Sequence, residues 1–166
     1  MEMAHDNLAS SWSTKLPAGH TRVRISRGGP RWLPAGSYKS YSAFFPGKWF
    51  KSVSSLEYLD LYNAMLTKLD PKRVVDELEA LAPNPTMLCF ESAKDIEAGI
   101  CYCHRHLAAQ WLEDSLGIKV EEVGHPDLPR FRYLQGKHFA PSYCGVSQSN
   151  SFVSLTCDRH AGQPVT

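Results

Sequence analysis

The stretch Thr86-Met87-Leu88-Cys89-Phe90-Glu91-Ser92 decides the fold class of this chain. It is short and apolar, prolines precede it and polar residues follow it, as expected for a central strand of a parallel sheet. Residues 54–69 and 70–81 before it, and residues 103–116 after it, repeat their apolar side chains at helical spacing. The pattern predicts an α/β fold in which helices connect parallel strands.

Two alternating segments supply further strands, at residues 20–26 and 118–123. We therefore expect a small three-layer parallel-sheet (Rossmann-like) sandwich with an irregular C-terminal tail. Its α/β core domain would span residues 20–124, after a flexible N-terminal arm at residues 1–19 and before an irregular extension at residues 125–166. A dinucleotide fingerprint of the GxGxxG type is absent from the sequence.

Size and composition favour one domain, because the chain has 166 residues and 43% of them are hydrophobic. The sequence shows neither a secretory leader nor an apolar run of the ~20 residues that span a membrane, so we expect a cytoplasmic protein without a membrane partner. Five cysteines without a framework spacing are typical of reduced thiols.

The charge is uneven along the chain, although the formal net charge is only +1. No acidic residue lies between Asp6 and Glu57, whereas that stretch carries eight basic residues and many aromatic ones. Basic side chains can bind phosphates, and aromatic side chains can stack on nucleobases. The alternative is that this basic stretch covers the acidic helices of its own chain. The anion-binding candidates in it are Arg24, Ser26, Arg27, Arg31 and Trp32.

The helix predicted from residue 103 opens on Cys103-His104-Arg105. A helix N-terminus carries unpaired N–H groups and a partial positive charge, so it suits an anion and lowers the pKa of a cysteine placed there. In an open parallel sheet, ligands bind at the carboxyl ends of the strands. The residues that follow two predicted strands, and should therefore meet this helix start, are Ser26, Arg27, Glu91 and Ser92.

One interpretation of this convergence is an enzyme, a hydrolase or transferase, that acts on a phosphate-bearing small molecule or nucleic acid. Glu91 would be the general base or nucleophile, assisted by Cys103 or His104. Arg27 and Arg105 would clamp the anion. The structural alternatives are that Glu91 only forms a salt bridge with an arginine and that Cys103 is a small capping residue.

Two other interpretations stay open. A zinc site could use thiols and imidazoles from Cys101, Cys103, His104 and His106, although four ligands from one short run would be strained. The third interpretation is a non-catalytic module that binds nucleic acid or a protein partner through residues 22–51. We expect no cofactor, and the oligomeric state is undetermined.

Several of these motifs occur together in a known family. The chain resembles the bacterial and phage "domain of unknown function 488" family in its Arg-rich turn at residues 24–32, its Leu-Asp-Pro at residues 69–71, and its Cys-Phe-Glu and Cys-His-Arg-His motifs at residues 89–91 and 103–106. The resemblance covers roughly residues 20 to 123. It implies an α/β fold and a shared site at these motifs, but no established reaction.

Overall fold

The computed structural model describes residues 7–97 and 103–126. Its elements, in chain order, are β1 (Asn7–Ser11), β2 (Thr21–Arg24), β3 (Lys39–Ser40), the 3-10 helices η1 (Ser42–Phe44) and η2 (Lys48–Lys51), α1 (Ser55–Leu66), α2 (Pro71–Leu81), β4 (Pro85–Cys89), α3 (Ala93–Glu97), α4 (His104–Leu116) and β5 (Val120–Glu122). Within the described residues, no helix is both long and apolar enough to span a membrane.

The strands form one five-stranded sheet in the order β3-β2-β4-β1-β5, and every pair in it is parallel. All five residues of β4 are buried, as a strand with neighbours on both sides requires. β3 connects to β4 through α1 and α2, and β4 connects to β5 through α3 and α4. The predicted α/β fold with a parallel sheet and flanking helices is therefore confirmed.

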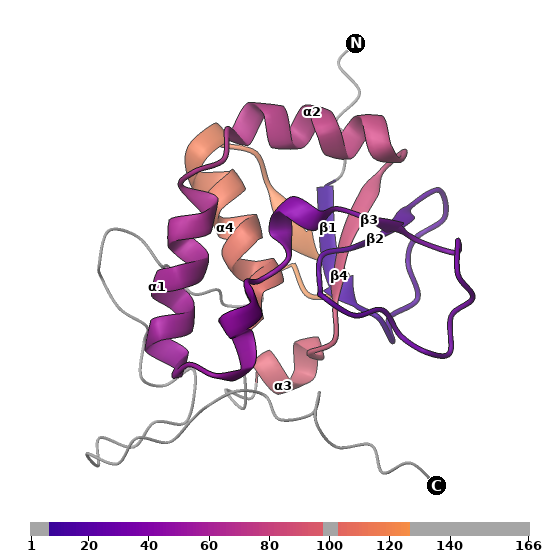
Figure 1. Cartoon of the computed structure of the whole chain (residues 1–166). Helices are drawn as coiled ribbons and strands as arrows, with labels where there is room; N and C mark the ends of the chain where they lie inside the picture. The colour runs from indigo at the N-terminus through magenta and orange to yellow at the C-terminus, as the bar shows by residue number, and fades with distance from the viewer. Residues whose placement is uncertain (1–6, 98–102, 127–166) are drawn as a thin grey trace, which may run out of the picture.

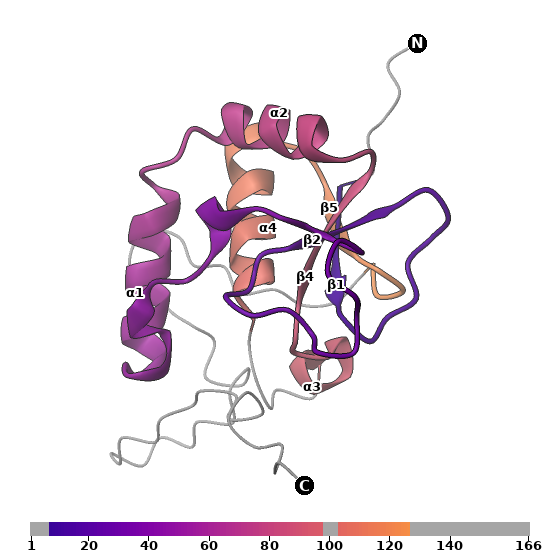
Figure 2. The same ribbon diagram turned by 45° about the vertical axis from the view of Figure 1, so that its right-hand side comes forward.

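The helices α1, α2 and α4 lie together on one side of the sheet, and the loops of residues 12–20 and 25–38 lie on the other (Figures 1 and 2). Val23 and Met87 are partners in adjacent strands, Met87 and Ala9 are partners in the next pair, and all three are buried in the core cluster below the helices. On the loop side, Trp12 contacts Tyr38 edge to face, with their ring centroids 5.0 Å apart. We call these two faces the helix side and the loop side.

The predicted helices α1 and α2 begin, and α4 ends, where their capping residues indicate, whereas α1 ends at Leu66, three residues before the predicted end. The hydroxyl of Ser54 accepts a hydrogen bond from the backbone N–H of Glu57, and the carboxylate of Asp70 accepts one from the backbone N–H of Arg73. Gly117 ends α4 in the left-handed conformation with φ of 68°, which glycine adopts without steric cost. These caps fix the start of α1 and α2 and the end of α4.

The N-terminal segment differs from the prediction. Asn7–Ser11, expected in a flexible arm, is strand β1 and lies between β4 and β5 in the sheet. The prediction was wrong because the segment lacks alternation and β-branched residues. Its small side chains suit a strand that is enclosed on both faces, and Ala9 and Ser10 are fully buried. The core domain thus begins by residue 7, not residue 20, and most of the predicted C-terminal extension lies outside the described residues.

Candidate metal centre and its surroundings

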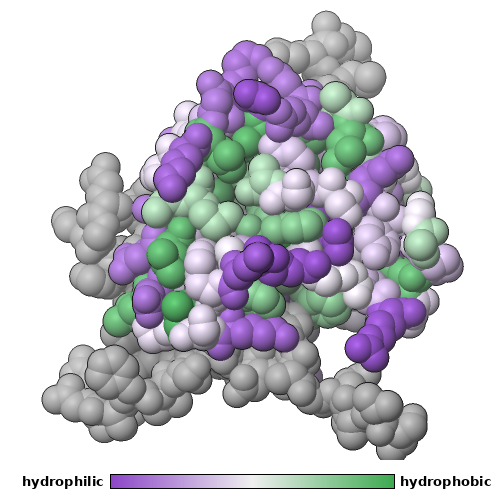
Figure 3. All heavy atoms as spheres, viewed as in Figure 1, coloured by the Kyte–Doolittle hydropathy of each residue, from purple (hydrophilic) through white to green (hydrophobic). Residues whose placement is uncertain are grey.

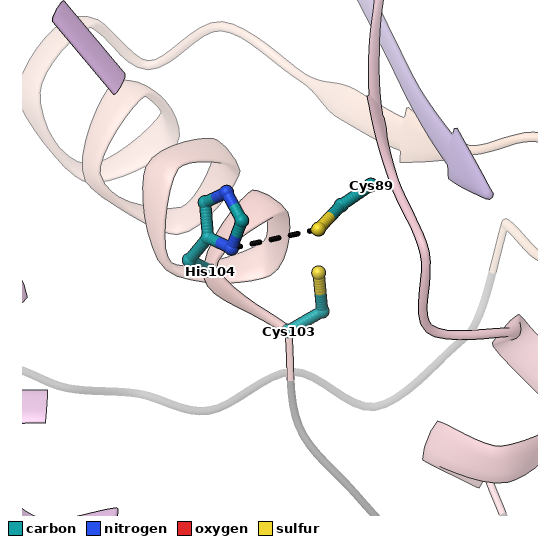
Figure 4. Close-up of side chains that lie close together, drawn as sticks. All are labelled: Cys89, Cys103 and His104. Atoms are coloured by element: carbon teal, nitrogen blue, oxygen red, sulfur yellow. Dashed lines mark hydrogen bonds between the residues drawn. The ribbon is translucent and has the colours of Figure 1, made fainter. Parts of the chain in front are cut away.

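Three side chains with sulfur or imidazole ligand atoms meet where β4 ends and α4 begins. Cys89 is the last residue of β4, Cys103 is the N-cap of α4, and His104 is the first residue of that helix. Figure 4 shows the two sulfur atoms and the imidazole ring turned toward one another. Their ligand atoms all lie within 4.8 Å of one another, and the three residues are 1%, 1% and 5% exposed.

The orientation of His104 is set by a backbone contact. Its Nε2 lies 2.9 Å from the carbonyl oxygen of Ile25, the residue that follows β2. A carbonyl can only accept a hydrogen bond, so Nε2 carries a proton and donates it. In the neutral ring the lone pair is therefore on Nδ1, which lies 3.6 Å from Sγ of Cys89. The contact with Ile25 thus directs an electron pair toward the two thiols.

The cluster favours a thiolate on Cys103. Burial opposes ionisation, but the hydrogen bond from Cys89 and the positive charge of Arg105 outweigh it and lower the pKa of Cys103 to about 7. Burial raises the pKa of the Cys89 thiol, and its hydrogen bond to Cys103 raises it further. Burial lowers the pKa of His104, but its hydrogen bond to Cys103, the negative charges of Cys103 and Glu91 and its contact with the backbone of Ile25 together raise it more, so the net shift is upward. Cys103 is therefore the thiol that ionises first.

Arg105 lies beside this cluster and is bound to the protein itself. Its Nη2 donates to Oε1 of Glu122 at 2.7 Å and its Nε donates to Oε2 at 3.0 Å, a bidentate pair in which the side chains are 0% and 1% exposed. Its Nη1 donates to the backbone carbonyl of Glu91 at 2.7 Å. The buried guanidinium of Arg105 thus binds Glu122 on β5, and it does not form the binding site for an external anion that the sequence suggested.

Three more of the predicted site residues, Ser26, Arg27 and Ser92, follow the carboxyl ends of β2 and β4, which are parallel neighbours. Ser26 is buried and donates a hydrogen bond to the carbonyl of Gly28. Arg27 is exposed, and its Nε donates to the carbonyl of Pro46. Ser92 accepts a hydrogen bond from the backbone N–H of Asp95 at the start of α3, so its hydroxyl has a structural role.

Glu91 is half-buried two residues after Cys89, and its charge raises the pKa values of Cys89, Cys103 and His104. The expected edge is therefore present, with a carboxylate near the thiols. Arg105 contacts Glu91 by donating a hydrogen bond to its backbone carbonyl. Cys103 does occupy the N-cap position of α4, as the structural alternative for it proposed, but its side chain makes no capping hydrogen bond.

The metal ligands differ from the set that the sequence suggested. Cys103 and His104 belong to the cluster, whereas Nε2 of His106 lies 2.9 Å from Oε2 of Glu122, in a separate buried contact. Cys101 lies outside the described residues. Cys89 takes the place of Cys101 and His106 in the cluster, because the end of β4 and the start of α4 meet at this edge. Ligands from two separate elements remove the strain expected for four ligands in one run.

Two residues that matter here were missed or undervalued. From the sequence, Glu122 was interpreted only as part of an alternating strand, although the alternation itself predicts which face of the sheet its side chain occupies. Val120 and Glu122 are two positions apart and share the helix side, so a carboxylate on an inward face called for a buried basic partner. Cys89 stood out in the sequence only as part of the central strand and of the Cys-Phe-Glu motif, and only the contact between the end of β4 and the start of α4 shows that it belongs to the cluster.

A scan against protein-family models, a search of curated proteins and a search of solved structures each gave no match to this chain. The resemblance to the family named above therefore stays a prediction. The fold and the site define an α/β parallel-sheet protein with a buried Cys-Cys-His cluster at the carboxyl edge of its central strand.

Proposed function

We propose that this chain is a zinc-dependent enzyme in which Cys89, Cys103 and His104 bind the metal and Glu91 assists a hydrolytic reaction. The observation that carries the proposal is the orientation of His104. Its Nε2–H is held by the carbonyl of Ile25, so that Nδ1 faces the two thiols. Histidines that ligate metals commonly donate their second ring N–H to a carbonyl or carboxylate in this way.

The distances fit a tetrahedral ion. With Zn–S of about 2.3 Å and Zn–N of about 2.0–2.1 Å, tetrahedral angles separate a sulfur from a nitrogen ligand by roughly 3.6 Å. The distance from Sγ of Cys89 to Nδ1 of His104 is 3.6 Å. Sγ of Cys103 lies within 4.8 Å of both, so a small displacement closes the set. The cluster therefore needs little rearrangement to bind zinc.

The charges fit a divalent cation as well. Two thiolates and a neutral imidazole balance the charge of Zn²⁺, and a metal ion removes the remaining thiol proton on binding. Arg105 is close, but its positive charge is already balanced by the bidentate pair with Glu122. The burial of the cluster, which makes free thiolates costly, is compatible with a neutral metal complex.

Three protein ligands leave one tetrahedral position for a water molecule, which is the arrangement of catalytic rather than structural zinc sites. Glu91 follows Cys89 closely enough for its charge to act on all three ligands. Zinc held by Cys89, Cys103 and His104 would supply Lewis acidity and lower the pKa of water, and Glu91 would serve as the general base that takes up the proton. This is the general-base role that the sequence analysis gave to Glu91.

Cobalt substitution tests the proposal directly. We expect Co²⁺ added to the metal-free protein to give the near-ultraviolet thiolate-to-cobalt charge-transfer band and the visible bands of a tetrahedral ion. Azide should then change the visible bands, because it replaces the water at the open position. Glu91→Gln should bind Co²⁺ as the wild type does, since this carboxylate is not a ligand, and should abolish any hydrolytic turnover found for the wild type.

The controls separate ligation from folding. Cys89→Ser and Cys103→Ser should lose the charge-transfer band, while Cys157→Ser, which changes a cysteine that is not one of the three proposed ligands, should keep it. Circular dichroism reports whether each variant is folded. A folded wild-type protein that gives no thiolate–cobalt band overturns the metal centre. A band that azide leaves unchanged overturns the open position, and with it the catalytic role.

A further inference from the structure

A basic surface lies on the part of the sheet that the helices do not cover. From the structure we infer that it binds single-stranded nucleic acid. The surface, called here the basic face, consists of Arg24, Arg27, Arg31 and Trp32 on β2 and the turn after it. This inference does not rest on the zinc centre, which lies on the helix side. Strongly hydrophilic side chains appear over α2 and again on the loop side of the space-filling view (Figure 3).

The basic residues between Asp6 and Glu57 lack acidic partners in the described part of the structure. There are eight of them, and none forms an ion pair within residues 7–97 and 103–126. Four of the six Lys and Arg residues elsewhere in that part of the structure are paired: Lys72 with Asp76, Arg73 with Glu77, Arg105 with Glu122 and Lys119 with Glu121. The alternative that the basic stretch covers its own acidic helices is therefore not supported by any ion pair of the described structure.

The residues outside the described structure carry no net negative charge to balance these cations: residues 1–6 contain two acids, Glu2 and Asp6, and residues 98–102 contain no charged residue. Residues 127–166 contain two acidic residues, Asp127 and Asp158, against four basic ones, which leaves that segment with a formal charge of +2. Whatever its placement, it adds positive charge to the chain. The unbalanced cations of the basic face thus call for a polyanion from outside the chain.

Arg24 is pre-positioned for such a partner. Its Nε donates to Oγ of Ser40 at 3.1 Å and its Nη1 donates to the carbonyl of Arg27 at 3.2 Å. Its guanidinium carbon lies 4.8 Å from the ring centroid of Phe45 and 6.0 Å from that of Tyr38. A guanidinium held over aromatic rings loses little freedom when it binds a phosphate, which favours binding.

An exposed aromatic side chain distinguishes a nucleic acid from other polyanions. Trp32 is 64% exposed beside the exposed Arg31, and it is the most exposed of the large hydrophobic side chains in the described structure. Burial of such a ring is normally favourable, so its exposure is explained if a base stacks on it in the complex. Single strands present unstacked bases, whereas duplexes do not. The combination of cations with an exposed indole therefore selects a single strand.

Binding of fluorescein-labelled single-stranded RNA and DNA to the full chain, measured by anisotropy over a range of salt concentrations, tests this inference. Trp32→Ala should weaken binding about tenfold, because stacking on one aromatic ring is lost. The triple variant Arg24→Gln/Arg27→Gln/Arg31→Gln should weaken it further and reduce the salt slope by about two, since each neutralised phosphate contributes roughly 0.7 to the slope for single strands.

A matched variant removes the same charge elsewhere. Lys68→Gln/Lys72→Gln/Lys119→Gln changes three exposed lysines on or beside the helices, and should leave binding within about twofold of the wild type. An equal loss in both triple variants overturns the basic face. Equal affinity for duplexes, equal competition by free mononucleotides, or binding only to vesicles of anionic lipid each overturns a single-strand surface. Retention of binding by the Cys103→Ser variant would separate this result from that of the zinc centre.

Discussion

Arg105 and Glu122 form a bidentate ion pair inside the protein, with both hydrogen bonds at 3.0 Å or less and neither side chain above 1% exposed. The pair joins the start of α4 to β5, the last strand of the sheet. A buried pair of this kind is not proof of net stabilisation, because both charges lose their hydration. It does make each partner depend on the other.

Removing the carboxylate charge should therefore be costly. Glu122→Gln leaves Arg105 charged and buried without its counter-ion, and we expect a loss of about 3–5 kcal/mol in the free energy of unfolding. Urea titration followed by circular dichroism measures it. The matched control is Glu121→Gln on the same strand, whose pair with Lys119 is solvent-exposed and should contribute less than about 1 kcal/mol. Equal effects of the two changes would contradict the buried role of Glu122.

The same carboxylate should make stability depend on acid. Burial raises the pKa of Glu122, but its contacts with His106 and Arg105 lower it more, so the folded pKa lies below the ordinary value of 4.5. A lowered pKa stabilises the folded state above the unfolded pKa, and the contribution is lost as the pH falls through the folded value. We expect unfolding free energy to fall below about pH 4.5 in the wild type. This decline should be shallower in Glu122→Gln. If the free energy of unfolding falls equally steeply with pH in the variant and in the wild type, other carboxylates cause the decline.

The position of β1 predicts an asymmetry between two alanines. Ala9 is 0% exposed between two strands, whereas Ala18 is exposed in the loop after β1. Ala9→Asp places an unpaired charge in the core and should prevent folding, while Ala18→Asp should change the free energy of unfolding by less than about 0.5 kcal/mol. A soluble, cooperatively melting Ala9→Asp variant would indicate that the N-terminal segment is not part of the sheet.

A glycine pair tests the end of α4. Gly117 has φ of 68°, and a Cβ added there meets nothing within 4 Å, so only backbone strain opposes an alanine. Gly117→Ala should lower the melting temperature, at a cost of about 1 kcal/mol. Gly28 has equally open surroundings without a positive φ, and Gly28→Ala should be neutral or slightly stabilising. The opposite order would mean that packing, not conformation, governs these sites.

The parts of the fold that the sequence predicted are those with strong local signals. The capping residues Ser54 and Asp70, the helical spacing that follows them, and the apolar stretch ending at Cys89 each favoured the element that formed. Strand β1 was not predictable in this way, because Ala9 and its serine neighbours owe their conformation to the two strands beside them. β3 has two residues and is too short to show a pattern.

The location of the site was predicted more accurately than the roles of its residues. Parallel neighbours bring the ends of β2 and β4 to one edge, as expected, and Cys103 and His104 lie at that edge. The partner of Arg105 could not be chosen from the sequence, because an arginine at a helix start is suited both to an external anion and to an inward carboxylate. Only the pairing of β1 with β5 places Glu122 next to it on the helix side.

Metal content is the most direct test of the proposed zinc centre. Protein purified without added metal and without chelator would be analysed by inductively coupled plasma mass spectrometry, with the folded fraction determined by circular dichroism. Wild-type and Cys157→Ser protein should carry stoichiometric zinc, whereas Cys89→Ser and Cys103→Ser protein should carry little, because each lacks one of the three ligands in the cluster. Folded wild-type protein free of bound metal, which also takes up none from a zinc solution, would contradict the proposal.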